Sequence, residues 1–274
     1  MRRAIESIVA FVTLVCSFAS EAQAEVRRVP EQYVTISAAI AASYDGDVVE
    51  VGPGTYAEGL NFGGREITVR STAGAATTIV DPVSGRCLTA TGQKGAGARL
   101  EGFTLRGGSA TQGGGVYVSA SSPVLVNCVI TGNTASSAGG GVYVASGSLQ
   151  LTGCTVSQNT SINGLGGGVY VPVNGTLQVT GGEVSGNTSR SGGGVYVDSN
   201  GTVTASNWVL SGNVASSAEG GGVSAQYGAS LELTGCTVSG NRSIGNGGGL
   251  WTSEGSVVVS NLSLIHISEP TRPY

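Results

Sequence analysis

Residues that could act as acids, bases or nucleophiles are sparse in most of this 274-residue chain. No lysine follows Lys94, and the only histidine is His266. Cleaving a glycosidic or ester bond needs carboxylates held as a pair, and Ca²⁺ needs several converging oxygens. The carboxylates between 107 and 261 occupy non-equivalent positions: Glu183, Asp198, Glu219, Glu232 and Glu254. We therefore predict no catalytic residue, no metal site and no cofactor. This prediction favours a protein that is not an enzyme, but it leaves enzymatic activity undecided.

Aromatic residues recur at one position of a repeated GGGVYV motif. Alternation along a strand would send the flanking valines inward and the tyrosine outward. Ser224 takes the place of the aromatic residue once. Two interpretations stay open: a ladder that stabilises the sheet, or a platform for sugar rings or a protein partner. The candidate binding face consists of Tyr117, Tyr143, Tyr170, Tyr196 and Trp251.

Asparagine also recurs at a fixed position of the repeat. Each asparagine ends a short apolar and hydroxyl-rich element, so we predict a structural ladder at one corner of the fold rather than a ligand site. Its members are Asn133, Asn159, Asn187, Asn213 and Asn241.

Cysteine forms a partial column of its own, with Gly182 and Asn207 expected in the intervening repeats. Residues in adjacent rungs lie about 4.8 Å apart, but parallel side chains keep the Cβ atoms wider than a disulfide prefers. We expect an inward stack of thiols at Cys128, Cys154 and Cys236, with a disulfide as the alternative. A zinc site would need ligands from different directions, which one column does not provide.

The repeat itself determines what must position these side chains. The third glycines of the triplets are Gly115, Gly141, Gly168, Gly194, Gly222 and Gly249, at steps of 26, 27, 26, 28 and 27 residues. Each repeat holds three short apolar segments and no helical period, so each predicts one rung of three strands. We therefore predict an all-β, single-stranded right-handed parallel β-helix with three sheets and about 27 residues per rung.

The two ends differ from the repeats. Residues 1–24 have a basic start, a short apolar run and Ala22-Gln23-Ala24, which is typical of a secretory signal peptide. Residues 25–106 are expected to form a capping helix at 36–42 and the first rungs, and residues 107–261 the regular repeats. Asp45 and Asp47 favour a turn over a calcium site. Residues 262–274 resemble a translated sequencing adapter, so we interpret them as a non-native tail after a truncated coil.

Composition excludes several classes of protein. Charged residues make up 11% of the chain and the net charge is −4, so the surface cannot neutralise a phosphate backbone and nucleic acid is not an expected partner. No segment after the leader is long and apolar enough to span a membrane. We expect an exported protein at the cell exterior or bacterial outer-membrane surface, with the periplasm as an alternative.

Two stretches resemble known families. Residues 33–110 resemble the opening of bacterial pectin-lyase-like β-helix proteins. The likeness is carried by the stretch TISAAIAASYDGDVVEVGPGTYAEGLNF. The GGGV and SGN elements resemble the repeat of chlamydial-type polymorphic outer membrane proteins, GGA(I/V/L) followed by FxxN. Gly replaces the Ala here, and the Phe position carries Val156, Val184, Leu210 and Val238. The first resemblance implies the fold and no particular activity, because that superfamily includes lyases, hydrolases, esterases and adhesins.

These observations favour a secreted or cell-surface scaffold, adhesin-like, that binds a glycan or a cell-surface protein. A missing C-terminal domain could associate it with the outer membrane. The alternative is a polysaccharide-active enzyme, similar to pectate lyases or glycoside hydrolases, whose active site lies outside the regular repeats.

Overall fold

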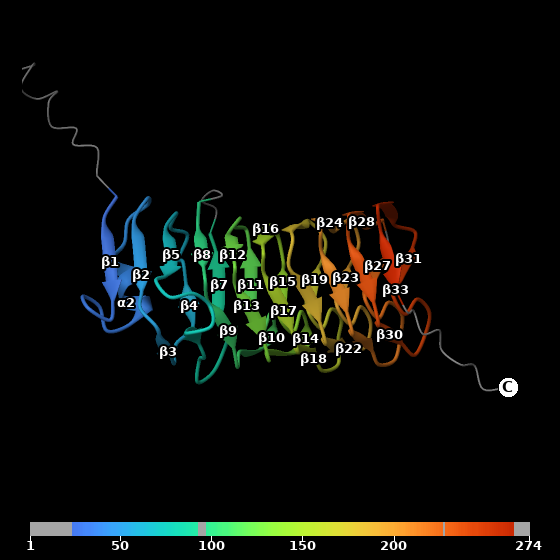
Figure 1. The fold of residues 1–274 in the computed structure, drawn as a ribbon, viewed down its shortest axis with the longest axis horizontal. Coiled ribbons are helices and arrows are strands. Elements are labelled where there is room, and N and C mark those ends of the chain that lie inside the picture. The colour runs from blue at the N-terminus through green and yellow to red at the C-terminus, as the bar shows by residue number, and fades with distance from the viewer. Residues whose placement is uncertain (1–23, 93–96, 227, 266–274) are drawn as a thin grey trace, which may run out of the picture.

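The chain folds into an elongated parallel β-solenoid. The computed structural model describes residues 24–92, 97–226 and 228–265. Figure 1 shows strands that cross the long axis and stack from the blue N-terminal end to the red C-terminal end. All the strand pairs are parallel and join a strand to its counterpart in the next coil. The predicted fold class is confirmed.

The strands form four sheets, which we name A to D. Sheet A contains, in spatial order, β1 (Val26–Val29), β2 (Val48–Val51), β5 (Thr68–Ser71), β8 (Arg99–Glu101), β12 (Val124–Val126), β16 (Gly147–Thr152), β20 (Gly175–Thr180), β24 (Thr202–Ser206), β28 (Ser230–Thr234) and β32 (Ser256–Ser260). Sheet B contains β3 (Gly54–Tyr56), β6 (Thr78–Val80), β9 (Thr104–Arg106), β13 (Val129–Thr131), β17 (Thr155–Ser157), β21 (Glu183–Ser185), β25 (Val209–Ser211), β29 (Thr237–Ser239) and β33 (Ser263–Ile265).

The other two sheets complete each coil. Sheet C contains β4 (Leu60–Asn61), β7 (Leu88–Thr91), β11 (Val116–Ser119), β15 (Val142–Val144), β19 (Val169–Val171), β23 (Val195–Val197), β27 (Val223–Gln226) and β31 (Leu250–Ser253). Sheet D contains β10 (Ser109–Gln112), β14 (Thr134–Ala138), β18 (Thr160–Ser161), β22 (Thr188–Ser189), β26 (Val214–Ala215) and β30 (Arg242–Ser243).

The expectation of three sheets was wrong, because the segment after each ladder asparagine pairs separately as sheet D. A residue with positive φ, such as Gln158 (φ 56°) or Gly186 (φ 61°), bends the chain just before the asparagine. The strand that follows is only two residues long in most rungs, for example Thr160–Ser161. Two residues are too few to show alternation in a sequence, so this sheet could not be seen there.

Side chains that point inward form the core, and they are aliphatic in nearly every rung. In β11, Val116 and Val118 are fully buried, whereas Tyr117 between them points outward. The same alternation holds in sheet A, where Leu149 and Leu151 are buried and Gln150 is exposed. Strict register therefore gives each side of the coil a fixed composition from rung to rung.

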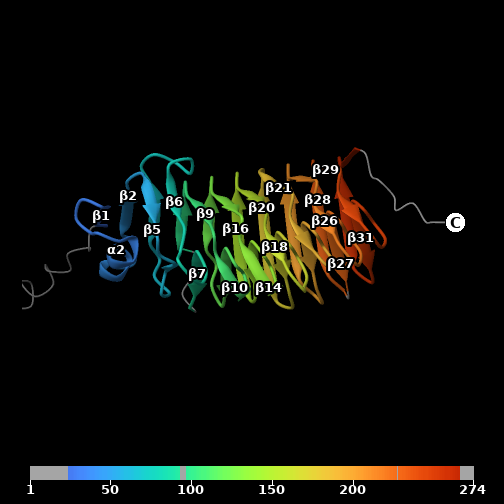
Figure 2. The same cartoon turned by 90° about the horizontal axis from the view of Figure 1, so that it is seen from below.

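A short helix covers the N-terminal end of the coil, as predicted. Helix α2 (Ile36–Ala42) is capped by Thr35, whose hydroxyl accepts a hydrogen bond from the Ala38 amide. Ile36 and Ile40 are buried against the core. Figure 2 shows α2 at the blue end, beside β1 and β2.

Asp47 holds the first rung together. Its carboxylate accepts hydrogen bonds from the backbone amides of Glu25 and Tyr44 and forms an ion pair with Arg27. Both side chains of the pair are nearly buried, at 7% exposure for Arg27 and 6% for Asp47. Burial alone would raise the pKa of Asp47, but the two amides and Arg27 together lower the pKa below its usual value.

Replacing Asp47 with asparagine is expected to destabilise the protein by about 3 kcal/mol at pH 7, because Arg27 loses its buried counter-charge. The depressed pKa gives stability above the unfolded-state pKa of Asp, about 3.9, that is lost at lower pH. The difference between wild type and Asp47→Asn in urea unfolding should therefore shrink below about pH 4. Asp81→Asn is the control, since Asp81 pairs with the half-exposed Arg106 and should cost less than about 1 kcal/mol. A pH-independent difference would contradict this account.

The segment interpreted from the sequence as a non-native tail, residues 262–274, begins inside the coil. Strand β33 (Ser263–Ile265) pairs in parallel with β29, and Leu262 packs partly buried against the core. His266 lies outside the described residues, as do residues 1–23 of the expected leader. Among the residues that are described, no helix has the length and apolar character needed to cross a bilayer.

Candidate functional site

The aromatic residues of the candidate binding face lie in register on sheet C. Tyr117, Tyr143, Tyr170 and Tyr196 come from adjacent strands, and their rings stack with centroids 5.6, 5.1 and 5.6 Å apart. Trp251 follows on β31 after Ser224 has interrupted the column.

Stacking places the ring faces of these tyrosines against each other. Tyr143, Tyr170 and Tyr196 are only 9%, 8% and 4% exposed, and they form a second small apolar cluster with Ala138 and Leu165. A sugar that stacks on an aromatic residue needs a free ring face. The structure therefore favours the stabilising ladder over the platform for the three central rings.

The polar ends of the tyrosines are hydrogen bonded. The Tyr170 hydroxyl donates to Asp198 at 2.8 Å, and the Gln112 amide donates to the Tyr143 hydroxyl at 3.2 Å. The Arg86 guanidinium lies 4.5 Å from the centre of the Tyr117 ring. Burial, followed by the Asp198 carboxylate, raises the pKa of Tyr170 far above its ordinary value. Tyr170 therefore stays protonated and serves as a donor, not as a base.

The asparagines lie one above another in the wall of the coil. From Asn159 onward, each side-chain oxygen accepts hydrogen bonds from the backbone and side-chain nitrogens of the asparagine in the preceding rung, at 2.9–3.0 Å. Each side-chain nitrogen also donates to a carbonyl, such as that of Val156 for Asn187. All five asparagines are buried, so their hydrogen-bonding groups face one another and not solvent.

Cys87 closes the ladder at its N-terminal end, a role that sequence reasoning missed. The Oδ1 of Asn133 has no preceding asparagine to bind, and it accepts from the Cys87 thiol at 3.3 Å and from the Gly108 amide at 2.9 Å. Burial raises the pKa of Cys87 to about 12. In the sequence, the only sign of this role is that the rung before Asn133 has no asparagine at the ladder position.

The other three cysteines in the described part of the chain, Cys128, Cys154 and Cys236, are buried free thiols. Cys128 and Cys154 are neighbours, with the Cys128 amide 3.5 Å from the Cys154 sulfur, and burial raises the pKa of Cys128. The assignment of Asn207 to this column was wrong. Asn207 (φ 53°) forms the turn before the column, and the buried Trp208 occupies the position itself.

Charged side chains gather on the first rungs of sheet A. Arg28, Glu50 and Arg70 are in register, and Glu50 forms ion pairs with both arginines. The hydrogen bond from Arg70, with the charge of both arginines, lowers the pKa of Glu50. A general acid needs a raised pKa, so Glu50 does not suit that role.

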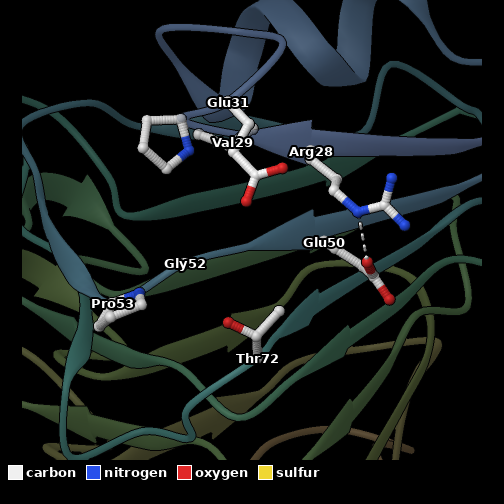
Figure 3. A pocket seen from close by; sticks show the side chains of 8 residues that line it. Arg28, Val29, Glu31, Glu50, Gly52, Pro53 and Thr72 are labelled. Carbon is white, nitrogen blue, oxygen red and sulfur yellow. Dashed lines mark ion pairs between the residues drawn. The ribbon is translucent and has the colours of Figure 1, made fainter.

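A pocket of about 320 Å³ opens beside these charges, and Figure 3 shows the side chains that line it. The Glu50 carboxylate turns toward Arg28, where the ion pair is drawn, and Glu31 lies beside Val29. Within the described part of the chain, no group of three His, Cys, Asp or Glu side chains is placed to hold a metal ion.

The fold and the in-register surface columns define the chain as a right-handed parallel β-helix. Residues 88–263 match the family described as "Right handed beta helix region", so the chain belongs to that family.

Two solved structures are similar to the chain. A pectin methylesterase mutant in complex with a hexasaccharide has a TM-score of 0.51 and 12% identity over 81% of this chain and 80% of its own. A pectin methylesterase from carrot has a TM-score of 0.46 and 12% identity over 88% of this chain and 82% of its own. At this identity the first likeness concerns the fold alone. The comparison with curated proteins gave no match.

Proposed function

We propose that this protein is an exported, adhesin-like β-helix scaffold that binds carbohydrate at a cell surface without chemically changing it. The observation that carries the proposal is the in-register repetition of outward side chains. An outer column of sheet A, for example, places Ser148, Thr176, Thr202 and Ser230 on successive rungs. A repeated surface suits a repeated ligand, whereas catalysis needs one unique cluster of groups.

The carboxylates of the chain support binding over turnover, because many of them are engaged in the fold. Asp47 and Glu50 are neutralised by arginines, and Asp198 accepts from Tyr170. The Glu58 carboxylate accepts from the amides of Ile36 and Ser37 at the start of α2. The pectin methylesterase mutant of similar fold is in complex with a hexasaccharide, and a carbohydrate is the ligand proposed here.

Binding and turnover can be measured on the same preparation of the full chain. We expect saturable binding to at least one immobilised glycan and no chemical change in it. The turnover arms are absorbance of unsaturated product from polygalacturonate, with and without Ca²⁺, and methanol release from methylated pectin. Product formed in proportion to protein concentration would establish an enzyme instead. Binding to no glycan, with retention on cell-surface proteins, would also overturn the proposal.

A further inference from the structure

The outer face of sheet A, from β16 to β32, carries three parallel columns of side chains. Strict register aligns these columns over five strands. The first column is Ser148, Thr176, Thr202, Ser230 and Ser256; the middle one is Gln150, Gln178, Thr204, Glu232 and Val258; the third is Thr152, Thr180, Ser206, Thr234 and Ser260. We call this surface the hydroxyl face.

Solvent reaches the hydroxyl face in every rung. The middle column is exposed throughout, and the two flanking columns are exposed or half-buried. The amides of Gln150 and Gln178 have no hydrogen-bond partner among the described residues, so their donors and acceptors are available to a ligand. Figure 1 shows β16, β24 and β28 in that order along the long axis of the coil, and β20 pairs between the first two.

The spacing of the columns selects the shape of the ligand. Side chains repeat about every 4.8 Å along the axis, and alternate residues lie about 6.7 Å apart along a strand. Five rungs therefore extend the two flanking columns of serine and threonine over about 19 Å, while one strand offers only three outward positions. A partner that uses the whole surface must be extended, must repeat, and must lie along the axis.

The chemistry of the columns selects the class of ligand. Hydroxyl and amide groups both donate and accept hydrogen bonds, as sugar hydroxyls do. Glu232 is the only charged residue on the hydroxyl face, so the surface offers no cation to a polyanion. A neutral polysaccharide needs no positive charge on the protein, whereas polygalacturonate or nucleic acid would find none on the hydroxyl face to pair with.

From these observations we propose that the hydroxyl face binds an extended neutral polysaccharide that lies along the coil axis. The inference rests on the proposed function and names the surface and the ligand class for it. A hydrogen bond exposed to water only replaces a hydrogen bond to water and contributes little net affinity, so several rungs must bind together. Affinity should therefore grow with ligand length until the ligand spans the surface.

Ligand class and length are tested first. The full chain is applied to an array of neutral oligosaccharides (β-glucan, xylan, mannan and chitin series) and of oligogalacturonates, each from dimer to octamer. We expect a neutral series to bind, with an affinity gain of about tenfold or more from dimer to hexamer. Preference for oligogalacturonates, or equal affinity for dimer and hexamer, would overturn the inference. So would binding to none of the neutral series.

The surface is tested with substitutions. Thr204→Arg places a long charged side chain in the centre of the hydroxyl face, and Thr237→Arg places the same side chain on the outer face of sheet B. We expect about tenfold weaker binding or more for the first and less than twofold change for the second. Circular dichroism and urea unfolding establish that both variants are folded. The double variant Gln178→Ala/Thr204→Ala removes groups without adding bulk and should also weaken binding.

These outcomes distinguish a failure of the hydroxyl face from a failure of the proposed function. If wild type binds a glycan and Thr204→Arg binds equally well, the hydroxyl face is wrong and the proposed function stands. If Tyr117→Ala abolishes binding and Thr204→Arg does not, the ligand sits on the tyrosine column instead. If wild type binds a cell-surface protein but no glycan, both proposals fail.

Discussion

Replacing Asn187 with alanine is expected to lower the free energy of unfolding by about 4 kcal/mol, measured by urea unfolding. Its side-chain oxygen accepts from the backbone and side chain of Asn159, and its side-chain nitrogen donates to the Val156 carbonyl and to Asn213. Alanine removes all four hydrogen bonds. It leaves the backbone amide and one side-chain N–H of Asn159 buried without partners, and each such group costs about 1–3 kcal/mol.

Asn163→Ala is the matched control for Asn187→Ala. Asn163 lies only four residues beyond Asn159, but its side chain is exposed at the edge of a shallow pocket. Its replacement should change stability by less than about 0.5 kcal/mol. Equal effects of the two substitutions would mean that the ladder adds little beyond ordinary asparagine solvation.

Replacing Gly167 with alanine is expected to cost about 4 kcal/mol or more, with loss of the folded state as the extreme result. A Cβ atom on Gly167 would lie 2.5 Å from the carbonyl oxygens of both Gly193 and Thr188. These are backbone atoms, one in the next rung and one in sheet D, and no side-chain rotation can move them away. Gly167, the middle glycine of its triplet, is needed because these two backbone segments pass too close to it for any side chain to fit.

Gly181→Ala separates this clash from the effect of backbone conformation. Gly181 has φ +65°, and a Cβ atom there would have no neighbour within 4 Å. Its replacement should cost only about 1–2 kcal/mol, the strain of a left-handed alanine. Hydrogen exchange in the rungs around β19 and β23 gives a readout for Gly167→Ala if the variant stays partly folded. A cost for Gly167→Ala no larger than that for Gly181→Ala would contradict the close-approach argument.

The sequence predicted the rung and its inward contents well, because both depend on a period that is visible in one dimension. The spacing of the GGGV triplets placed the strands of sheet C at matching positions, and alternation correctly put Val142 and Val144 inside. The capping helix after Thr35 was also predicted correctly, because a cap and a helical run are local signals.

Alternation alone could not decide what covers the outward side chains. It correctly placed Tyr143 and Tyr170 outside the main core, but it could not reveal that Leu165 and Ala138 pack around them. Ala138 is the last residue of β14 in sheet D and Leu165 lies between β18 and β19, and sheet D is too short to be seen in the sequence. For the same reason Cys87 was not recognised as the end of the ladder, since its partner Asn133 lies 46 residues away.

By itself, the sequence determined the parallel coil, its period and the polarity of its inner and outer faces, because each rung repeats the same inward and outward residues. Only the tertiary structure decided how many sheets a rung makes and which outward columns remain open to solvent. Those properties depend on the bends between strands, and a bend is set by one or two residues and by contacts with neighbouring rungs. The tyrosine column is therefore largely covered, and the plainer serine, threonine and glutamine columns of sheet A are exposed.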